Sequence, residues 1–253
     1  VPAAGVATAT AIAQYVSAML IMVHLLRRKD ECHVSLKKIR FHKKACIDIL
    51  VIGIPAGIQN AIFAIANLFV QSGVNSFDTC MVSCSAAATN ADTIIYNVMY
   101  AFYIACSSFM GQNYGAGNKK RVLKSYFISL FYSFTIGLIL GLLLFIFGHQ
   151  FLSLFATDAT VIDAGMQRIK IMAFSYCFSS FMDCTIAASR GIGKTIIPTI
   201  IIIMGSCVFR IVWIYTVFAW IHTIPALFLL YLFSWIITSI AEITYFIIIY
   251  RKL

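Results

Sequence analysis

The chain has 253 residues, of which 61% are hydrophobic and only 11% are charged, and its mean hydropathy is +0.92. Soluble domains carry roughly 25% charged residues, so this composition excludes a soluble fold. The net charge of +10 comes from basic residues that gather between the apolar stretches. A membrane protein is therefore predicted, and nucleic acid is not an expected partner.

Seven apolar stretches are each long enough to cross a bilayer, which takes about 20 residues of helix. Transmembrane strands would instead show only about ten residues of alternating polarity. The predicted fold class is therefore all-α, a polytopic membrane bundle of seven transmembrane helices. The expected spans are 3–26, 46–72, 80–110, 123–147, 161–189, 196–220 and 224–250.

Lysine and arginine lie in alternate gaps between these spans. Eight of them fall within 27–44 and four within 119–124, whereas the gaps 73–79 and 221–223 contain none. Loops rich in these residues stay in the cytoplasm. We therefore expect a multi-pass protein of the cell membrane whose two basic gaps and C-terminus are cytoplasmic.

Two basic residues, Arg168 and Lys170, break this pattern at the start of the fifth span. Long basic side chains can extend along apolar surface to reach water, so we expect both to lie at the outer interface. The basic stretch 27–44 is expected to be a solvated loop that can also attract the anionic lipids of the inner leaflet.

No set of residues predicts catalysis, a metal site or a cofactor. The five histidines lie near span ends or in loops and form no HExxH pair, and the eight cysteines form no CxxC pair. The run Gly191-Ile192-Gly193-Lys194-Thr195 lacks the earlier glycine of a phosphate-binding loop. The sequence thus predicts a protein that is not an enzyme and uses no cofactor.

Charged residues inside the spans are the main functional candidates, because an acid at bilayer depth costs roughly 2.5 to 3.5 kcal/mol on insertion scales. Asp92, Asp183 and Glu242 lie in the third, fifth and seventh spans, and Arg210 lies in the sixth. These acids are predicted to take part in cation coupling or in the substrate pathway. The alternative is that Arg210 pairs with one acid to permit packing, and Glu242 best suits that pairing.

Amide and aromatic side chains add to this set. Asn60 and Asn67 are seven residues apart in the second span, so they share a helix face and are expected to line a cavity or to hold helices together. Tyr96, Tyr100 and Tyr103 in the third span could offer aromatic faces to a cation, although such rings are also common packing residues.

Three motifs give the chain a specific resemblance. They are Gly53-Ile54-Pro55 at the start of the second span followed by Val74-Asn75-Ser76-Phe77, the run Gly111 to Gly117 after the third span, and Ser189 to Thr195 with Pro198 after the fifth. In this order and spacing the chain resembles the multidrug and toxic compound extrusion (MATE) family over essentially all of its length. The glycine pairs at 115 and 117 and at 191 and 193 suit tight cytoplasmic turns.

This resemblance implies a transporter of twelve helices in two six-helix lobes, which rock around a central cavity and export amphipathic organic cations in exchange for H⁺ or Na⁺. The seven spans resemble the sixth to the twelfth helix. Residues 1–26 would then be the last helix of the N-terminal lobe, 27–45 the basic cytoplasmic linker and 46–253 the C-terminal lobe. The implied partners are drug-like cations, H⁺ or Na⁺, membrane lipids and a missing N-terminal lobe.

One position departs from the family pattern. In the sodium-linked branch a glutamate lies about two turns beyond the Gly-x-Pro motif, whereas Phe63 stands near that place here. The alternative function is a flippase of lipid-linked precursors from the same superfamily. Such a flippase is expected to place several basic residues in its cavity, and Arg210 is the only one that the sequence places deep in a span.

Overall fold

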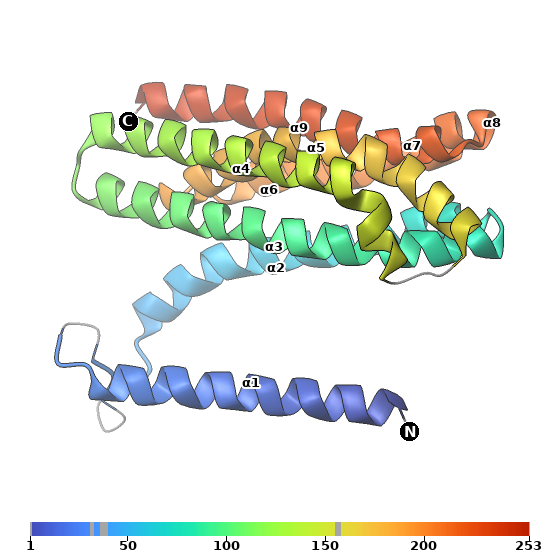
Figure 1. Cartoon of the computed structure of the whole chain (residues 1–253). Helices are drawn as coiled ribbons and strands as arrows, with labels where there is room; N and C mark the ends of the chain where they lie inside the picture. Colours follow the sequence, from blue (N-terminus) through green and yellow to red (C-terminus); the bar gives the residue numbers. More distant parts are fainter. Residues whose placement is uncertain (1, 31–32, 36–39, 155–157, 253) are drawn as a thin grey trace. The chain divides into compact units, whose positions relative to one another are not determined.

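A computed structural model describes residues 2–30, 33–35, 40–154 and 158–252, and these residues form helices and short connections without any strand (Figure 1). Seven helices are long and apolar enough to cross a membrane. The predicted all-α bundle of seven spans is therefore confirmed. The helices are α1 (Pro2–Arg27), α2 (Lys43–Asn75), α3 (Thr79–Gly115), α4 (Lys119–Ser153), α5 (Ala159–Gly191), a sixth span made of α6 (Ile196–Ile202), η2 (Ile203–Val208), α7 (Phe209–Trp213), η3 (Ile214–Phe218) and α8 (Ala219–Ile221), and α9 (Ile224–Lys252).

The helices are longer than the apolar stretches, because polar residues at their ends continue the helical backbone hydrogen bonds. The sequence indicated that Pro55 lies near the start of the second span. α2 instead begins at Lys43, so Pro55 lies inside the helix. A proline at an interior position removes one backbone hydrogen bond. Membrane helices tolerate this loss when neighbouring groups compensate for it.

The chain divides into two compact units, Val1–Asp48 and Ile49–Leu253. In the first unit, every side chain of α1 from Ala7 to His24 is exposed. Large apolar side chains such as Tyr15 and Met19, which are 79% and 70% exposed, suit contact with lipid. Arg28 and Asp30 form an ion pair of 2.6 Å just after this helix.

The second unit is a helical bundle with α5 at its centre, in contact with α3, α4 and α9. In α5, 72% of the residues of the most apolar stretch are buried, compared with 39% or less in every other candidate span. Small side chains make this position possible, since they let neighbouring backbones approach closely. The run Cys184 to Ser189 supplies six consecutive buried positions.

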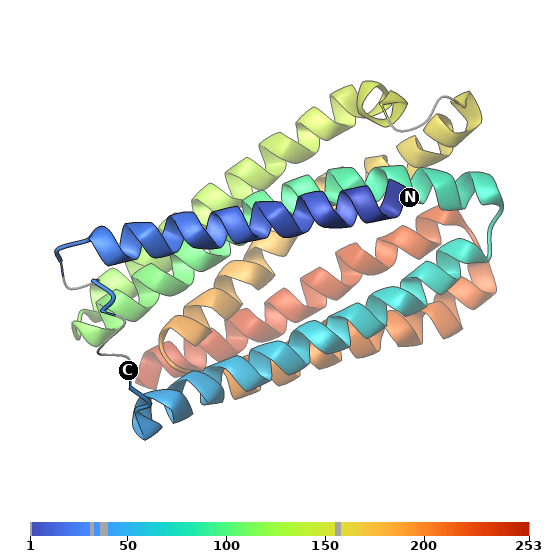
Figure 2. The same ribbon diagram turned by 90° about the horizontal axis from the view of Figure 1, so that it is seen from below.

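The second span lies beside the sixth within this unit (Figure 2). The ring centroids of Phe69 and Tyr215 are 6.3 Å apart, and those of Phe77 and Phe218 are 5.8 Å apart. These aromatic contacts join the C-terminal end of α2 and the turn after it to η3.

Two turns depend on glycine. Gly117 and Gly193 have φ of 68° and 79°, a left-handed conformation that side chains with a Cβ rarely adopt. Gly115 and Gly191, expected to form turns as well, instead end α3 and α5. A Cβ on Gly191 would lie only 2.7 Å from the carbonyl oxygen of Ser107, so this glycine permits close packing of α5 on α3.

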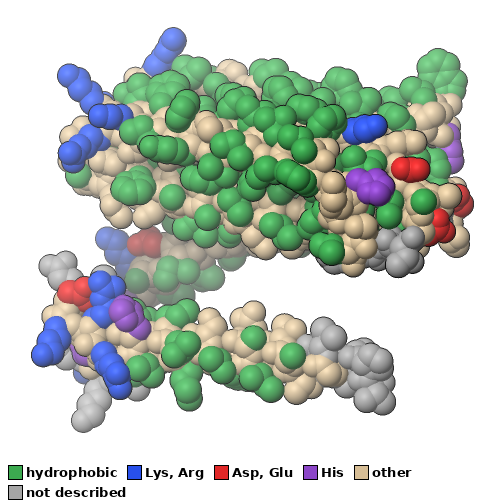
Figure 3. Space-filling view, in the orientation of Figure 1, with side chains coloured by type: hydrophobic (Ala, Val, Ile, Leu, Met, Phe, Trp, Pro, Cys, Tyr) green, Lys and Arg blue, Asp and Glu red, His purple; other side chains and the backbone are tan. Residues whose placement is uncertain are grey.

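Basic side chains gather at one end of this bundle, while hydrophobic side chains cover its length (Figure 3). α4 starts with Lys119, Lys120 and Arg121, and α9 ends with Arg251 and Lys252. The bundle therefore has one strongly positive end.

Candidate functional site: polar side chains inside the bundle

Asp92 of α3 and Arg168 of α5 form an ion pair, and the hydroxyl of Tyr176 donates a hydrogen bond to the same carboxylate. Arg168 is only 5% exposed, so the prediction that it reaches the outer interface is wrong. A buried guanidinium requires a counter-charge, and Asp92 on the neighbouring helix supplies it. Lys170, two residues further along, is exposed as expected.

Further contacts of Arg168 reach α3, while its buried Nε has no hydrogen-bond partner among the described residues. Its Nη1 lies 2.6 Å from the carbonyl oxygen of Ser85 and 3.3 Å from the hydroxyl of Thr89. Its guanidinium carbon lies 4.9 Å from the ring centroid of Phe228 on α9. The arginine thus joins three helices through one charged group.

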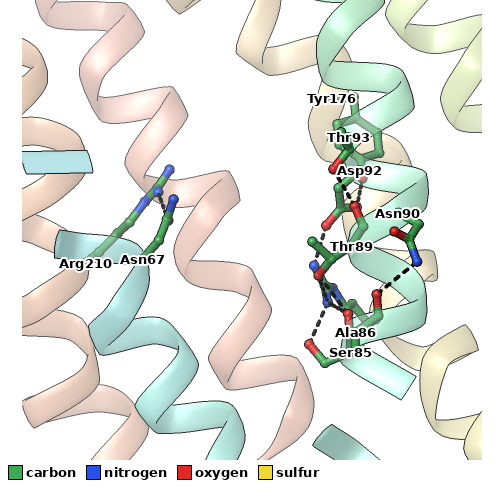
Figure 4. Close-up of polar contacts among 10 residues, drawn as sticks. Asn67, Ser85, Ala86, Thr89, Asn90, Asp92, Thr93, Tyr176 and Arg210 are labelled. Carbon is green, nitrogen blue, oxygen red and sulfur yellow. Dashed lines mark hydrogen bonds and ion pairs between the residues drawn. The ribbon is translucent and has the colours of Figure 1, made fainter. Parts of the chain in front are cut away.

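Polar side chains close to Asp92 in the sequence make other contacts (Figure 4). The amide of Asn90 donates to the carbonyl of Ala86, and the hydroxyl of Thr93 donates to the carbonyl of Thr89. Both bonds stay within α3. The described hydrogen-bond partners of Asp92 are therefore the guanidinium of Arg168 and the hydroxyl of Tyr176, and not Asn90 or Thr93.

Arg210 of α7 is 2% exposed and forms no ion pair with any described residue. Its Nη1 donates to the side-chain oxygen of Asn67 on α2 at 3.2 Å, and Figure 4 shows these two side chains pointing toward one another. The alternative in which Arg210 pairs with Glu242 is therefore not realised in the described structure.

Glu242 of α9 is fully buried, and neither carboxyl oxygen has a hydrogen-bond partner among the described residues. The basic group that interacts with it electrostatically is Arg190, at the end of α5. Arg190 donates to the hydroxyl of Tyr103 and to the side-chain oxygen of Gln59, each at 2.7 Å. A polar cluster therefore connects α2, α3, α5 and α9 in the half of the bundle near its basic end.

Asp183 of α5 is half-buried and has neither a hydrogen bond nor an ion pair within the described part of the chain. The hydroxyls close to Asp183 in the sequence donate their hydrogen bonds elsewhere. The hydroxyl of Ser179 donates to the carbonyl of Tyr176, and that of Thr185 donates to the carbonyl of Phe181. Neither hydroxyl therefore donates to the carboxylate of Asp183.

Asp183 interacts electrostatically with Tyr96 and Tyr103 of α3. The rings of Tyr96, Tyr100 and Tyr103 form a stack, which we call the tyrosine ladder, with centroid distances of 6.0 Å and 5.4 Å and interplanar angles of 18° and 7°. Tyr96 and Tyr100 are 60% and 47% exposed. The ladder and Asp183 together offer aromatic faces and one negative charge.

The amides of α2 face different ways. Gln59 is buried against Arg190, whereas Asn60 is exposed. Asn67 is exposed but holds Arg210. Two of these three amides therefore satisfy arginines from other helices.

A family model described as MatE matches residues 55–216, more than half of the chain. The chain belongs to the MatE family. This family consists of membrane transporters, so the resemblance read from the motifs is confirmed.

The chain is similar to multidrug resistance proteins of bacteria. It is 26% identical to the probable multidrug resistance protein YoeA of Bacillus subtilis (strain 168) over 79% of this chain and 44% of that protein. It is 23% identical to the probable multidrug resistance protein NorM of Thermotoga maritima over 78% of this chain and 42% of that protein. The chain thus spans about half the length of the curated relatives it matches.

The fold matches a crystal structure of MATE in complex with MaL6 with a TM-score of 0.86. The match covers 97% of this chain and 56% of that chain at 18% sequence identity. At this identity the likeness concerns the fold, and it accounts for the seven helices and their order.

Three residues of the polar clusters in this MatE chain were not predicted as site residues: Arg190, Tyr176 and Gln59. The distribution of basic residues places Arg190 in a cytoplasmic gap, yet its side chain donates to Tyr103 and Gln59 inside the bundle. Tyr176 is one turn from Ser179 and carries no sequence signal of its own. A buried acid needs hydrogen-bond donors. Only this requirement could have indicated a tyrosine on a neighbouring helix.

Proposed function

We propose that this chain is the C-terminal part of a secondary active multidrug antiporter, which exports amphipathic organic cations across the cell membrane in exchange for H⁺ or Na⁺. Membership of the MatE family supports transport, and the names of the bacterial relatives support multidrug resistance. The half-length match supports a division into the last helix of an N-terminal lobe (1–26), a basic linker (27–45) and a C-terminal lobe (46–253), with an N-terminal lobe outside this chain.

The observation that carries the proposal is the tyrosine ladder beside Asp183. A cation over an aromatic face gains about 0.5 to 2 kcal/mol. Tyr96 is the exposed end ring of the ladder, and Asp183 adds a negative charge that no described side chain neutralises. This combination suits a flat, positively charged organic compound.

Cation coupling is assigned here to the acids inside the spans, with Asp183 first. A carboxylate that binds either an organic cation or H⁺ exchanges the two, because both cannot occupy it together. Glu242 is a second candidate, since its buried oxygens have no described partner. Asp92 ranks third, because Arg168 and Tyr176 already satisfy it. Asn60 and Asn67 line the α2 side of the same pathway in this proposal.

The experiment that tests this function uses the whole transporter in lipid vesicles loaded with a fluorescent organic cation. An imposed H⁺ or Na⁺ gradient should drive efflux, and efflux should stop when the gradient is removed. The 253 residues alone should insert in the membrane without exporting the dye, because one wall of the cavity is absent. Transfer of a lipid-linked pyrophosphate between leaflets, without gradient-driven dye efflux, would contradict the proposal and favour a flippase.

A further inference from the structure

Arg210 lies near the middle of the sixth span, 14 residues after Ile196 in a helical segment of 26 residues. Its side chain is 2% exposed. A charge at this depth is costly unless another charge or a set of strong hydrogen bonds compensates for it. The contacts of Arg210 therefore decide what it can do.

Neutral groups surround this guanidinium. Asn67 accepts from Nη1 at 3.2 Å, while the hydroxyl of Ser234 is 3.5 Å from Nε, which is long for a hydrogen bond. The rings of Tyr231 and Phe63 lie with their centroids 4.4 Å and 5.4 Å from the guanidinium carbon. No described carboxylate pairs with it, in contrast to Arg168.

Aromatic rings leave the in-plane N–H groups of a guanidinium available, and these groups match the two oxygens of a carboxylate or phosphate. Only one strong acceptor, the amide oxygen of Asn67, uses them in the described structure. Arg210 thus retains a positive charge and donors for an anion.

On the α2 side, the contacts of Arg210 lie nearer the surface. Asn67 is exposed and Phe63 is half-buried, so the contacts on α2 reach the surface of the lobe. The helix around Arg210 is also irregular, because π-helical turns lie on each side of α7 at Ile203–Val208 and Ile214–Phe218. Such turns are rare and occur frequently at functional sites.

We propose that Arg210 and Asn67 bind the anionic group, a carboxylate or a phosphate, of an aromatic solute that the transporter carries. This inference rests on the proposed transport function and adds an anion site to it, separate in charge from Asp183 and the tyrosine ladder. Phe63 and Tyr231 would contact the aromatic part of the solute. A carboxylate from a part of the transporter outside this chain has the same chemistry, and the test distinguishes the two sources.

The test measures binding of 2-naphthoate and of its neutral analogue 2-naphthamide to the whole transporter in lipid nanodiscs, by calorimetry. Naphthoate should bind at least about tenfold more tightly than naphthamide, since one charged contact inside a protein exceeds that value. Arg210→Gln should remove this preference and leave the affinity for naphthamide unchanged. Lys170→Gln removes an exposed charge from the same lobe and should preserve the preference.

Asn67→Asp covers the case in which Arg210→Gln does not fold. The new carboxylate would take the place of the anion at 3.2 Å from the guanidinium, so this variant should fold with a melting temperature at or above the wild-type value and should lose the preference for naphthoate. Equal affinity of the wild type for the two compounds, or a preference that survives Asn67→Asp, would overturn the proposal. If the wild type shows no preference for naphthoate but exports the cationic dye normally, the partner of Arg210 would be a carboxylate of the transporter itself. That result would reject this inference without rejecting the transport function.

Discussion

Asp92 and Arg168, 76 residues apart in the chain, neutralise one another between α3 and α5. Ser85, Thr89 and Phe228 complete the surroundings of the arginine, so its charge is balanced, although its buried Nε has no hydrogen-bond partner among the described residues. By comparison, Arg210 and Glu242 are more deeply buried and have no ionic partner among the described residues. The lobe therefore contains one compensated pair that stabilises the bundle, whereas Arg210, Glu242 and Asp183 have no ionic partner among the described residues.

Removal of one partner of the Asp92–Arg168 pair should destabilise the lobe. Asp92→Ala or Arg168→Met alone leaves a charge with no counter-ion, and such losses cost about 3 to 5 kcal/mol at buried sites. Asp92 is 23% exposed, so the lower end of this range is expected. The double variant should be less unstable than the sum of the single variants. Unfolding in mixed micelles with increasing SDS measures all three.

The exposed residues Asp163 and Lys170 of α5 provide the control for that cycle. Asp163→Ala and Lys170→Met should each change stability by no more than about 0.5 kcal/mol, because surface substitutions away from special features have small effects. Additive effects of Asp92→Ala and Arg168→Met would show that the pair contributes no coupling and would reject its stabilising role.

The sequence predicted the spans correctly because hydrophobic length is a local property, readable within a window of about 20 residues. It failed for Arg168 because local position alone suggested an interface, whereas the decisive partner lies on another helix. The sequence also left open whether Arg210 pairs with Glu242. The answer depends on how far each helix is shifted along its axis, which is set by tertiary packing. The tyrosine ladder shows the intermediate case, in which the spacing of the rings is local but their position beside Asp183 depends on tertiary packing.

Close packing of α4 on α5 depends on Gly141. A Cβ at this position would lie 2.0 Å from the carbonyl oxygen of Ala173, a backbone atom that cannot move without shifting α5. Gly141→Ala should therefore destabilise the lobe by about 1 to 3 kcal/mol, as overpacking usually does. Gly53→Ala is the matched control, since no atom lies within 4 Å of its Cβ and alanine favours a helix by roughly 0.5 to 1 kcal/mol. Thermal unfolding in detergent should give shifts of opposite sign, and equal shifts would contradict the packing argument.

The charge distribution predicts the orientation of the bundle, with its basic end and C-terminus in the cytoplasm. Single-cysteine reporters at Ala116 and Lys194, which are exposed near that end, should react only with a reagent that reaches the cytoplasm. Reporters at Thr79 and Thr223 should react with an impermeant reagent added outside. Ala116 is preferable to Asn118, because the Asn118 side chain caps α4 by accepting from the backbone N–H of Arg121. Labelling of Ala116 from outside would reverse the orientation.

Asp183 is the acid whose replacement should affect transport most directly. Its carboxylate is half-buried beside the tyrosine ladder and has no described partner, so Asp183→Asn removes a charge without leaving another charge unpaired. Export of an organic cation by the whole transporter should fall by about tenfold or more, since a direct charged contact is worth more than 1.4 kcal/mol. Asp163→Asn, which removes an exposed acid from the same helix, should export at the wild-type rate. Tyr100→Leu keeps an apolar side chain but removes the middle ring of the ladder, and it should reduce export of flat cations more than that of aliphatic ones. Equal gradient-driven efflux in wild type, Asp183→Asn and Tyr100→Leu would exclude this site from the pathway and leave Glu242 as the remaining uncompensated acid of the lobe.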